Sequence, residues 1–273
     1  MLKQELLVID PQVDFCYAGF TITESILEGK TDEEKALIIE LSKPGALFVN
    51  GADKDMSRLA KAVKKISHKI WDIHVTLDSH HLLDIAHPLF WKGIDGKHPN
   101  PFTIISEQDV KDGVWTASIH ELRNDALKYV SALAANKRYP LCIWPPHCLI
   151  GSNGYKIVPE LFDAFCEWEK DSKEIVDYVT KGSNFMTEHY SAVMADVPDP
   201  SDPGTQLNTR LINILKEADR ILIAGEASSH CLKFTIEDIA NNIPLSSPLS
   251  EIFRFSEVLI SFFSILKIDS ISF

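Results

Sequence analysis

Four short apolar runs, separated by amphipathic stretches, limit the folds open to this chain more than any other feature. The runs with strand character are 4–10, 69–77, 174–180 and 219–227, and helical patterns are expected near 54–66, 122–135, 158–169, 205–217 and 232–242. Strands that alternate with helices are joined by crossovers, which make neighbouring strands parallel. The sequence therefore predicts an α/β fold with a doubly wound, mainly parallel sheet.

The last of these strands leads through Ser228-Ser-His-Cys231 into a helical pattern. A helix N-terminus offers free N–H groups and a positive partial charge, which can lower the pKa of a thiol and hold an oxyanion. Cys231 is therefore a candidate nucleophile. Taken alone, such a segment more often contains a cysteine that packs as a small apolar residue.

Two other predicted strands end in charged residues. The first ends at Asp10, with Asp14 four residues later, and the third is followed by Lys181 and Gly182. In an open parallel sheet, the carboxyl ends of the strands form the functional edge, so an acid, a lysine and a thiol are expected at one rim. The residues alone leave alternatives, because Asp14 could be the functional acid with Asp10 as a cap, and Lys181 could be a solvated strand end.

A polar cluster, Asp78-Ser-His80-His81, follows the second predicted strand, and His87 lies beyond it. Alternate residues of an extended chain share a side, so Asp78 and His80 can offer oxygen and nitrogen ligands to one divalent metal. A lone Asp-x-His pattern is also typical of a solvated polar loop.

These segments together resemble the isochorismatase-like cysteine hydrolases and, within them, the nicotinamidases. The resemblance rests on the opening Val-Ile-Asp-x-Gln-x-Asp-Phe, the Lys-Gly pair after a central strand, and Gly-x-Ala-x-x-x-Cys with a threonine four residues on. A fourth segment, Trp144-Pro-Pro-His-Cys148 with glycines at 151 and 154, is similar to one found in nicotinamidases. The matching segments cover most of residues 5–242 and imply a three-layer α/β/α arrangement.

The resemblance implies a catalytic set of Asp10, Lys181 and Cys231. It also implies an oxyanion site made by the backbone N–H groups of Ala227 and Cys231, and a cis peptide bond between Glu226 and Ala227. Two aromatic residues are expected to flank the ring of the substrate, although buried aromatic residues are commonly plain core. These are Phe15 and Trp144.

The resemblance also implies a divalent metal, with zinc expected and manganese or iron as alternatives. Its task would be to bind the pyridine nitrogen of the substrate. The implied ligands are Asp78, His80, His87 and His147. His87 follows His80 by seven residues instead of the expected six, which leaves an insertion or a different ligand open, with His81 as the substitute.

The function implied is a cysteine amidohydrolase that converts nicotinamide to nicotinate and ammonia through a thioester on Cys231. Two alternatives remain: another amidase of the group acting on ureido or carbamoyl substrates, and a catalytically inactive binding relative. A true isochorismatase cleaves a vinyl ether without needing a thiol, so the cysteine argues against that reaction.

Composition agrees with an enzyme that acts on a small molecule. The net charge of −12 argues against a nucleic-acid partner, which would require a concentrated basic surface. Five cysteines are an odd number without the spacing of a disulfide framework, and the chain does not open with a signal-like segment, so a reduced, cytoplasmic protein is expected. The apolar run 258–268 is interrupted and too short for a membrane span. Whether the chain forms a homo-oligomer stays open.

The expected organisation is a hydrolase domain over 1–243, followed by a divergent C-terminal segment, 244–273. An insertion is expected around 88–143, and its helical part is a candidate lid or oligomer contact. The Phe-, Ile-, Leu- and Ser-rich C-terminal segment departs from the family pattern. It could be a divergent terminal element, an altered reading frame or a partner-binding segment.

Overall fold

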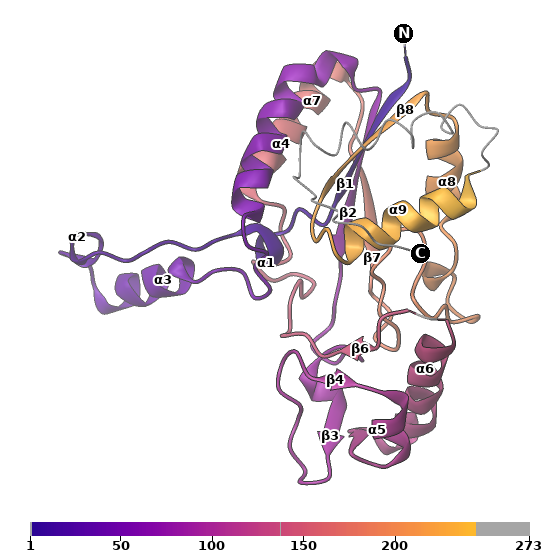
Figure 1. The fold of residues 1–273 in the computed structure, drawn as a ribbon. Coiled ribbons are helices and arrows are strands. Elements are labelled where there is room, and N and C mark those ends of the chain that lie inside the picture. The colour runs from indigo at the N-terminus through magenta and orange to yellow at the C-terminus, as the bar shows by residue number, and fades with distance from the viewer. Residues whose placement is uncertain (1, 137, 244–273) are drawn as a thin grey trace, which may run out of the picture.

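A parallel sheet of four strands forms the centre of the protein (Figure 1). The computed structural model describes residues 2–136 and 138–243. The strands are β1 (Gln4–Ile9), β2 (Asp72–Asp78), β7 (Asp177–Lys181) and β8 (Arg220–Gly225), in the order β7-β2-β1-β8. All three pairings are parallel, so the predicted fold class is confirmed.

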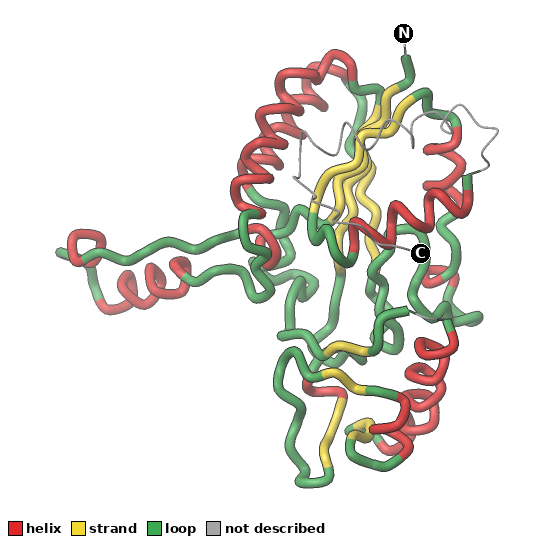
Figure 2. Tube along the Cα trace, in the orientation of Figure 1, coloured by secondary structure: helices red, strands yellow, loops and turns green. Residues whose placement is uncertain are grey.

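Helices cover both faces of this sheet, as Figures 1 and 2 show. One face carries α4 (Ala52–Ile66) and α7 (Pro159–Ser172), and the other carries α8 (Thr209–Lys216) and α9 (Cys231–Asn242). Side chains alternate along β1, so Leu6 and Val8 join the core under α4 and α7, while Leu7 and Ile9 join the other core. Each buried aliphatic side chain contributes about 1.5–3 kcal/mol, which fixes the strand register.

The predicted elements differ from the observed ones mainly at their starts. The strand expected from 69 begins at Asp72, because residues Ser67–Lys69 close a short 3₁₀ turn. The helix expected from 205 begins at Thr209, because Asn208 caps it by accepting a hydrogen bond from the Leu211 N–H. The segment before it holds the 3₁₀ turn Pro203–Thr205.

A smaller layer of structure lies beside the carboxyl edge of the sheet (Figure 1). It contains two short antiparallel pairs of strands, 91–93 with 115–117 and 104–105 with 141–142, and its own apolar core around Phe90 and Trp91. Its elements are η2 (Pro88–Phe90), β3 (Trp91–Gly93), β4 (Ile104–Ile105), α5 (Glu107–Lys111), β5 (Trp115–Ala117), η3 (His120–Leu122), α6 (Arg123–Ala135) and β6 (Leu141–Cys142). That residues 88–143 are an insertion into the fold stays a prediction.

An arm of residues 18–46 projects from the body (Figure 2). After α1 (Val13–Cys16) come α2 (Glu24–Leu27) and α3 (Asp32–Ser42), neither of which contains a buried residue. The sequence patterns did not predict α3, because it has no buried apolar stripe to generate one. Its start is set locally by a capping box between Thr31 and Glu34.

All five cysteines are free. Within residues 2–136 and 138–243, no helix has both the length and the apolar character needed to cross a bilayer. The predicted C-terminal segment 244–273 lies outside the described residues.

Candidate active site and metal centre

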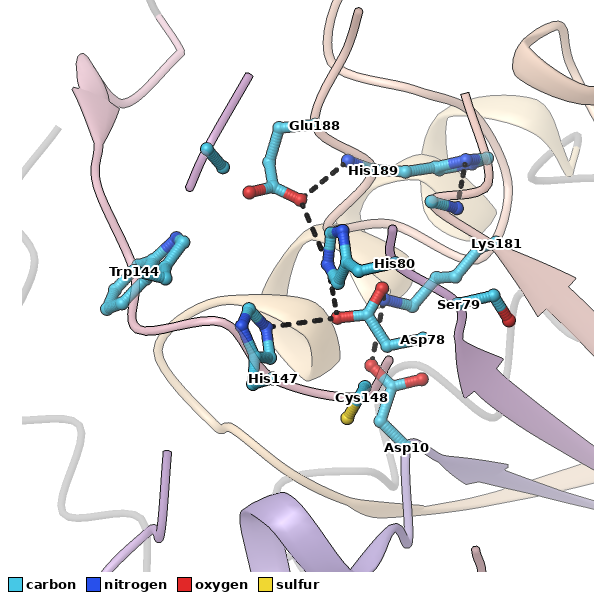
Figure 3. Close-up of polar contacts among 12 residues, drawn as sticks. Asp10, Asp78, Ser79, His80, Trp144, His147, Cys148, Lys181, Glu188 and His189 are labelled. Atoms are coloured by element: carbon cyan, nitrogen blue, oxygen red, sulfur yellow. Dashed lines mark hydrogen bonds and ion pairs between the residues drawn. The ribbon is translucent and has the colours of Figure 1, made fainter. Parts of the chain in front are cut away.

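Charged side chains, among them Asp10, Asp78 and Lys181, meet at the carboxyl edge of the sheet (Figure 3). Asp10 directly follows β1, Asp78 ends β2, Lys181 ends β7 and Cys231 begins α9. Asp78 and Lys181 are register partners on neighbouring strands. The four residues are distant in sequence, and the parallel topology places them together.

The ammonium group of Lys181 is the centre of this group. Its Nζ lies 2.9 Å from Asp10 Oδ2, 3.2 Å from Asp78 Oδ1 and 3.6 Å from the Cys231 sulfur. All four side chains are buried. The structure therefore brings together the three residues of the implied catalytic set, and Lys181 is not a solvated strand end.

Asp10 and Asp14 have different surroundings. Asp10 Oδ1 accepts a hydrogen bond of 2.6 Å from the Thr76 hydroxyl, and its backbone has φ 46°, a left-handed conformation that is strained for a residue other than glycine. Asp14 instead accepts backbone N–H groups of Cys148, at 2.7 Å, and Ala46, at 3.0 Å. Asp14 thus connects loops, and Asp10 is the acid that faces the lysine and the thiol.

Burial dominates the protonation of this cluster. It raises the pKa of the Cys231 thiol well above its usual value, against the opposing effect of the Lys181 ammonium. The lowered thiol pKa expected from a helix N-terminus is therefore not found, because complete desolvation of the thiolate outweighs the positive charge nearby. Burial also raises the pKa of the Asp10 carboxyl, against Lys181. A carboxylate with a raised pKa is a better proton acceptor for the thiol.

The turn before α9 contains backbone N–H groups without a backbone partner. In the described part of the chain, the N–H groups of Ala227 and Cys231 make no backbone hydrogen bond, while those of His230 and Leu232 both donate to the Ala227 carbonyl. The peptide bond between Glu226 and Ala227 is cis, as the resemblance implied. Two free donors next to a thiol could hold a developing oxyanion.

A second group of side chains, on the other side of Asp78, has the composition of a metal site. Asp78 Oδ2 lies 3.2 Å from His80 Nε2 and 3.6 Å from His147 Nε2, and the three ligand atoms are within 4.8 Å of one another. All three residues are buried. Oxygen and imidazole ligands suit zinc, manganese and iron.

The hydrogen bonds around this group fit a metal. His80 Nδ1 lies 3.0 Å from Asp84 Oδ2, and His147 Nδ1 lies 2.9 Å from the Pro145 carbonyl, so each ring can use its second nitrogen as a ligand. His80 Nε2 is buried without a hydrogen-bond partner among the described residues. Gly182 leaves room for the Asp78 carboxylate, because a Cβ added at this position would lie 2.8 Å from Asp78 Oδ1. The φ of 80° at Gly182 also favours glycine.

The structure places the other two histidines differently. The His87 ring packs against those of His80 and His147, with centroid distances of 5.1 and 5.4 Å, but its nitrogens are not part of the compact ligand set. His87 Nδ1 lies 3.0 Å from the His81 carbonyl. The His81 side chain is exposed, so it does not substitute for His87. A ligand role for His87 stays a prediction.

The two expected substrate-flanking aromatics contact different histidines. Phe15 is buried, and its ring meets His147 edge-on at 5.3 Å. Trp144 is half-buried; it donates to the Tyr190 hydroxyl at 3.1 Å and meets the His230 ring at 5.4 Å. Both therefore border the site, and their contact with a substrate stays a prediction.

Three residues at this site were not predicted from the sequence. Thr76 orients Asp10, Asp84 orients His80, and Glu188 places Oε1 3.8 Å from His80 Nε2 while its Oε2 is buried without a hydrogen-bond partner. Burial raises the pKa of Glu188 to about 8. The strand alternation Thr76–Asp78 could have indicated Thr76, but nothing local distinguishes Glu188, which lies in an irregular segment.

The fold described above is shared with solved nicotinamidase structures. The yeast nicotinamidase bound to the inhibitor nicotinaldehyde superimposes with a TM-score of 0.52 at 18% identity, over 95% of this chain and 96% of that one. Another structure of the yeast nicotinamidase gives 0.51, also at 18% identity, over 87% and 82% of the two chains. These similarities establish the fold.

In sequence, the chain is similar to the nicotinamidase of Escherichia coli strain K12. The two are 31% identical over 101 residues, which is 36% of this chain and 40% of that relative. The similarity thus spans well under half of the curated relative's length. No model of a protein family matches the chain. The resemblance read from the sequence is confirmed as a likeness to nicotinamidases in fold and in part of the sequence.

Proposed function

We propose that this protein is a cysteine amidohydrolase that converts nicotinamide to nicotinate and ammonia. The observation that carries the proposal is the position of one buried ammonium group, Lys181 Nζ, against the Asp10 carboxylate and the Cys231 sulfur. The sequence similarity to the E. coli nicotinamidase and the shared fold of the yeast enzyme support it.

The first half of the reaction forms a thioester. The Asp10 carboxylate takes the proton of the Cys231 thiol, and Lys181 stabilises the thiolate through charge. The sulfur then attacks the carboxamide carbon, so that a C–S bond forms and the carbonyl electron pair moves to oxygen. The N–H groups of Ala227 and Cys231 receive this oxyanion. The oxyanion collapses, the C–N bond breaks, and the Asp10 carboxylic acid gives its proton to the departing nitrogen, which leaves as ammonia.

The second half hydrolyses the thioester. Asp10, now a carboxylate again, takes a proton from a water molecule as the water oxygen attacks the thioester carbon. The C–S bond breaks, the acid product leaves, and the proton returns to the sulfur. Asp10 thus acts as base, acid, base and acid in turn, which a carboxyl group with a raised pKa can do at neutral pH.

A divalent metal would be held by Asp78, His80 and His147 in this proposal. When bound, it would supply a Lewis-acid contact to a ring nitrogen of the substrate and so orient the ring. Phe15 and Trp144 would border that ring. The chain's own residues near the metal, Asp84 and the Pro145 carbonyl, fix the two imidazoles in the orientation that a ligand requires.

The test is ammonia release from nicotinamide by the purified chain, with and without added zinc or manganese. We expect release by the parent protein, loss of release in Cys231→Ala, and unchanged release in Cys166→Ala, whose thiol is exposed. A folded, metal-loaded protein that releases no ammonia from nicotinamide but acts on a ureido or carbamoyl compound would replace the proposal with the other amidase class. A folded protein inactive on both classes would indicate a binding relative.

A further inference from the structure

A second cluster of metal-ligating groups lies toward the amino ends of the same strands. Glu5 of β1 pairs in register with Asp72 of β2, and His74 is two residues further along β2. One ligand atom from each of the three lies within 4.8 Å of the others. His74 is four residues before Asp78, which is about 13 Å along a strand, so the cluster is separate from the site at the carboxyl edge.

Glu5 is the residue that needs an explanation. Its side chain is fully buried, and its Oε1 atom makes no hydrogen bond within the described residues. The Lys3 ammonium, which is itself about one-third exposed, lies 3.5 Å away. A buried carboxylate is costly unless it is neutralised, and the partly exposed Lys3 ammonium is the one cation within 4 Å of this oxygen in the described part of the chain.

His74 is oriented as a metal ligand would be. Its Nδ1 lies 2.8 Å from Asp177 Oδ2, and the same oxygen accepts a hydrogen bond of 2.9 Å from Arg210 of α8. The carboxylate therefore fixes the ring and its tautomer, an arrangement typical of imidazoles that bind zinc through the other nitrogen. That other nitrogen, Nε2, lies 3.3 Å from Glu5 Oε2, which is about the separation of two ligands on one zinc ion.

Asp72 gives the cluster access to solvent. It is only partly buried, while Glu5 and His74 are fully buried. One of its oxygens accepts the N–H of Ile73, at 2.9 Å. The other charged groups facing the cluster are Lys3, Asp177 and Arg210. Three carboxylates (Glu5, Asp72 and Asp177) face two basic side chains (Lys3 and Arg210). When His74 is neutral, the group therefore carries a net charge of −1.

We propose that Glu5, Asp72 and His74 form a second binding site, for a divalent transition metal of the zinc type, with Asp177 as the residue that positions His74. In the metal-free protein, a proton on His74 would supply the missing positive charge. Only a neutral imidazole can be a metal ligand, so metal binding would require His74 to lose this proton. The site does not depend on the proposed amidase activity.

The test is the zinc stoichiometry of the full chain, measured by titration calorimetry and by elemental analysis after dialysis. His80→Ala removes the site at the carboxyl edge, so binding that remains in this variant reports the second site alone. We expect one equivalent of zinc in His80→Ala and none when Asp72→Asn or His74→Gln is added. Cobalt in place of zinc should give d–d absorption bands in His80→Ala that the added substitutions remove.

Two variants separate ligation from folding. Asp72→Asn changes a partly exposed carboxylate and should keep the fold by circular dichroism, and Asp177→Asn should weaken zinc binding in the His80→Ala background by about 10 to 100 fold without abolishing it. Glu33→Gln on α3 is the control and should change nothing. The proposal is overturned if His80→Ala binds no zinc, or if its zinc affinity survives Asp72→Asn unchanged.

Discussion

Lys181 Nζ lies 3.2 Å from Asp78 Oδ1, so the residue that would hold the metal also touches the residue that would stabilise the thiolate. The same nitrogen is 2.9 Å from Asp10. One buried cation thus neutralises two buried carboxylates that belong to different parts of the proposed chemistry. Replacement of Lys181 itself should therefore affect both metal binding and nucleophile reactivity.

Replacement of Lys181 by methionine should abolish amide hydrolysis and destabilise the fold. The substitution leaves Asp10 and Asp78 buried without their cation, and breaking such pairs typically costs about 3–5 kcal/mol. Urea unfolding of Lys181→Met and of the control Lys61→Met, at an exposed position on α4, measures this difference. Stability within 1 kcal/mol of the parent would show that the two carboxyl groups do not depend on Lys181.

Replacement of Gly182 by alanine should weaken metal binding. The backbone there has φ 80°, and the new Cβ would press on Asp78 Oδ1. The left-handed conformation costs a residue other than glycine about 1–2 kcal/mol, and the displaced carboxylate would lose its geometry. Zinc affinity measured with a chromophoric chelator should fall by at least tenfold. Gly113→Ala, also at positive φ but with open space around it, is the matched control and should leave the affinity unchanged.

Removal of the metal should raise KM more than it lowers the reactivity of the thiol. The ligands lie on one side of Asp78 and the sulfur on the other, against Lys181. Chelator treatment and His147→Ala should therefore weaken binding of nicotinamide, while iodoacetamide still alkylates Cys231 at a similar rate. A parallel loss of alkylation would mean that the ligand group also holds the thiol in place.

Glu226 should make the protein less stable as pH rises. Burial raises the pKa of this carboxyl from 4.5 to about 7 in the folded state, so the native protein keeps a proton that the unfolded chain releases. Stability then falls as pH rises from about 4.5 to 7. Glu226→Gln should remove this loss and be more stable at pH 8, by on the order of 2–3 kcal/mol.

Thermal unfolding of Glu226→Gln between pH 4.5 and 8 tests this, with Glu24→Gln on the exposed α2 helix as the control. The carboxyl group is close enough to Arg58 for that cation to lower its pKa, although burial has the larger effect. A stability gain that is equal at pH 4.5 and pH 8 would contradict the assignment.

The sequence by itself determined the four strands of the central sheet, the main helices and the candidate site residues. Strand and helix periodicities are local, so the core strands and helices were predicted to within a few residues. The short motifs indicated Asp10, Lys181, Cys231 and the Asp78 group, because each lies at or just after the end of a strand or begins a helix. The capping box that begins α3 is also local, but no apolar pattern marked that helix.

Tertiary structure decided which of these residues touch, and how they titrate. Only the strand order β7-β2-β1-β8 brings the Lys181 ammonium group into contact with both Asp78 and Asp10, and only burial reverses the expected pKa of the Cys231 thiol. Asp14 and Asp10 could not be separated locally, since their roles depend on the loops and side chains that approach them from distant segments. Contacts and desolvation arise from packing across the sheet, and no single segment of the sequence contains them.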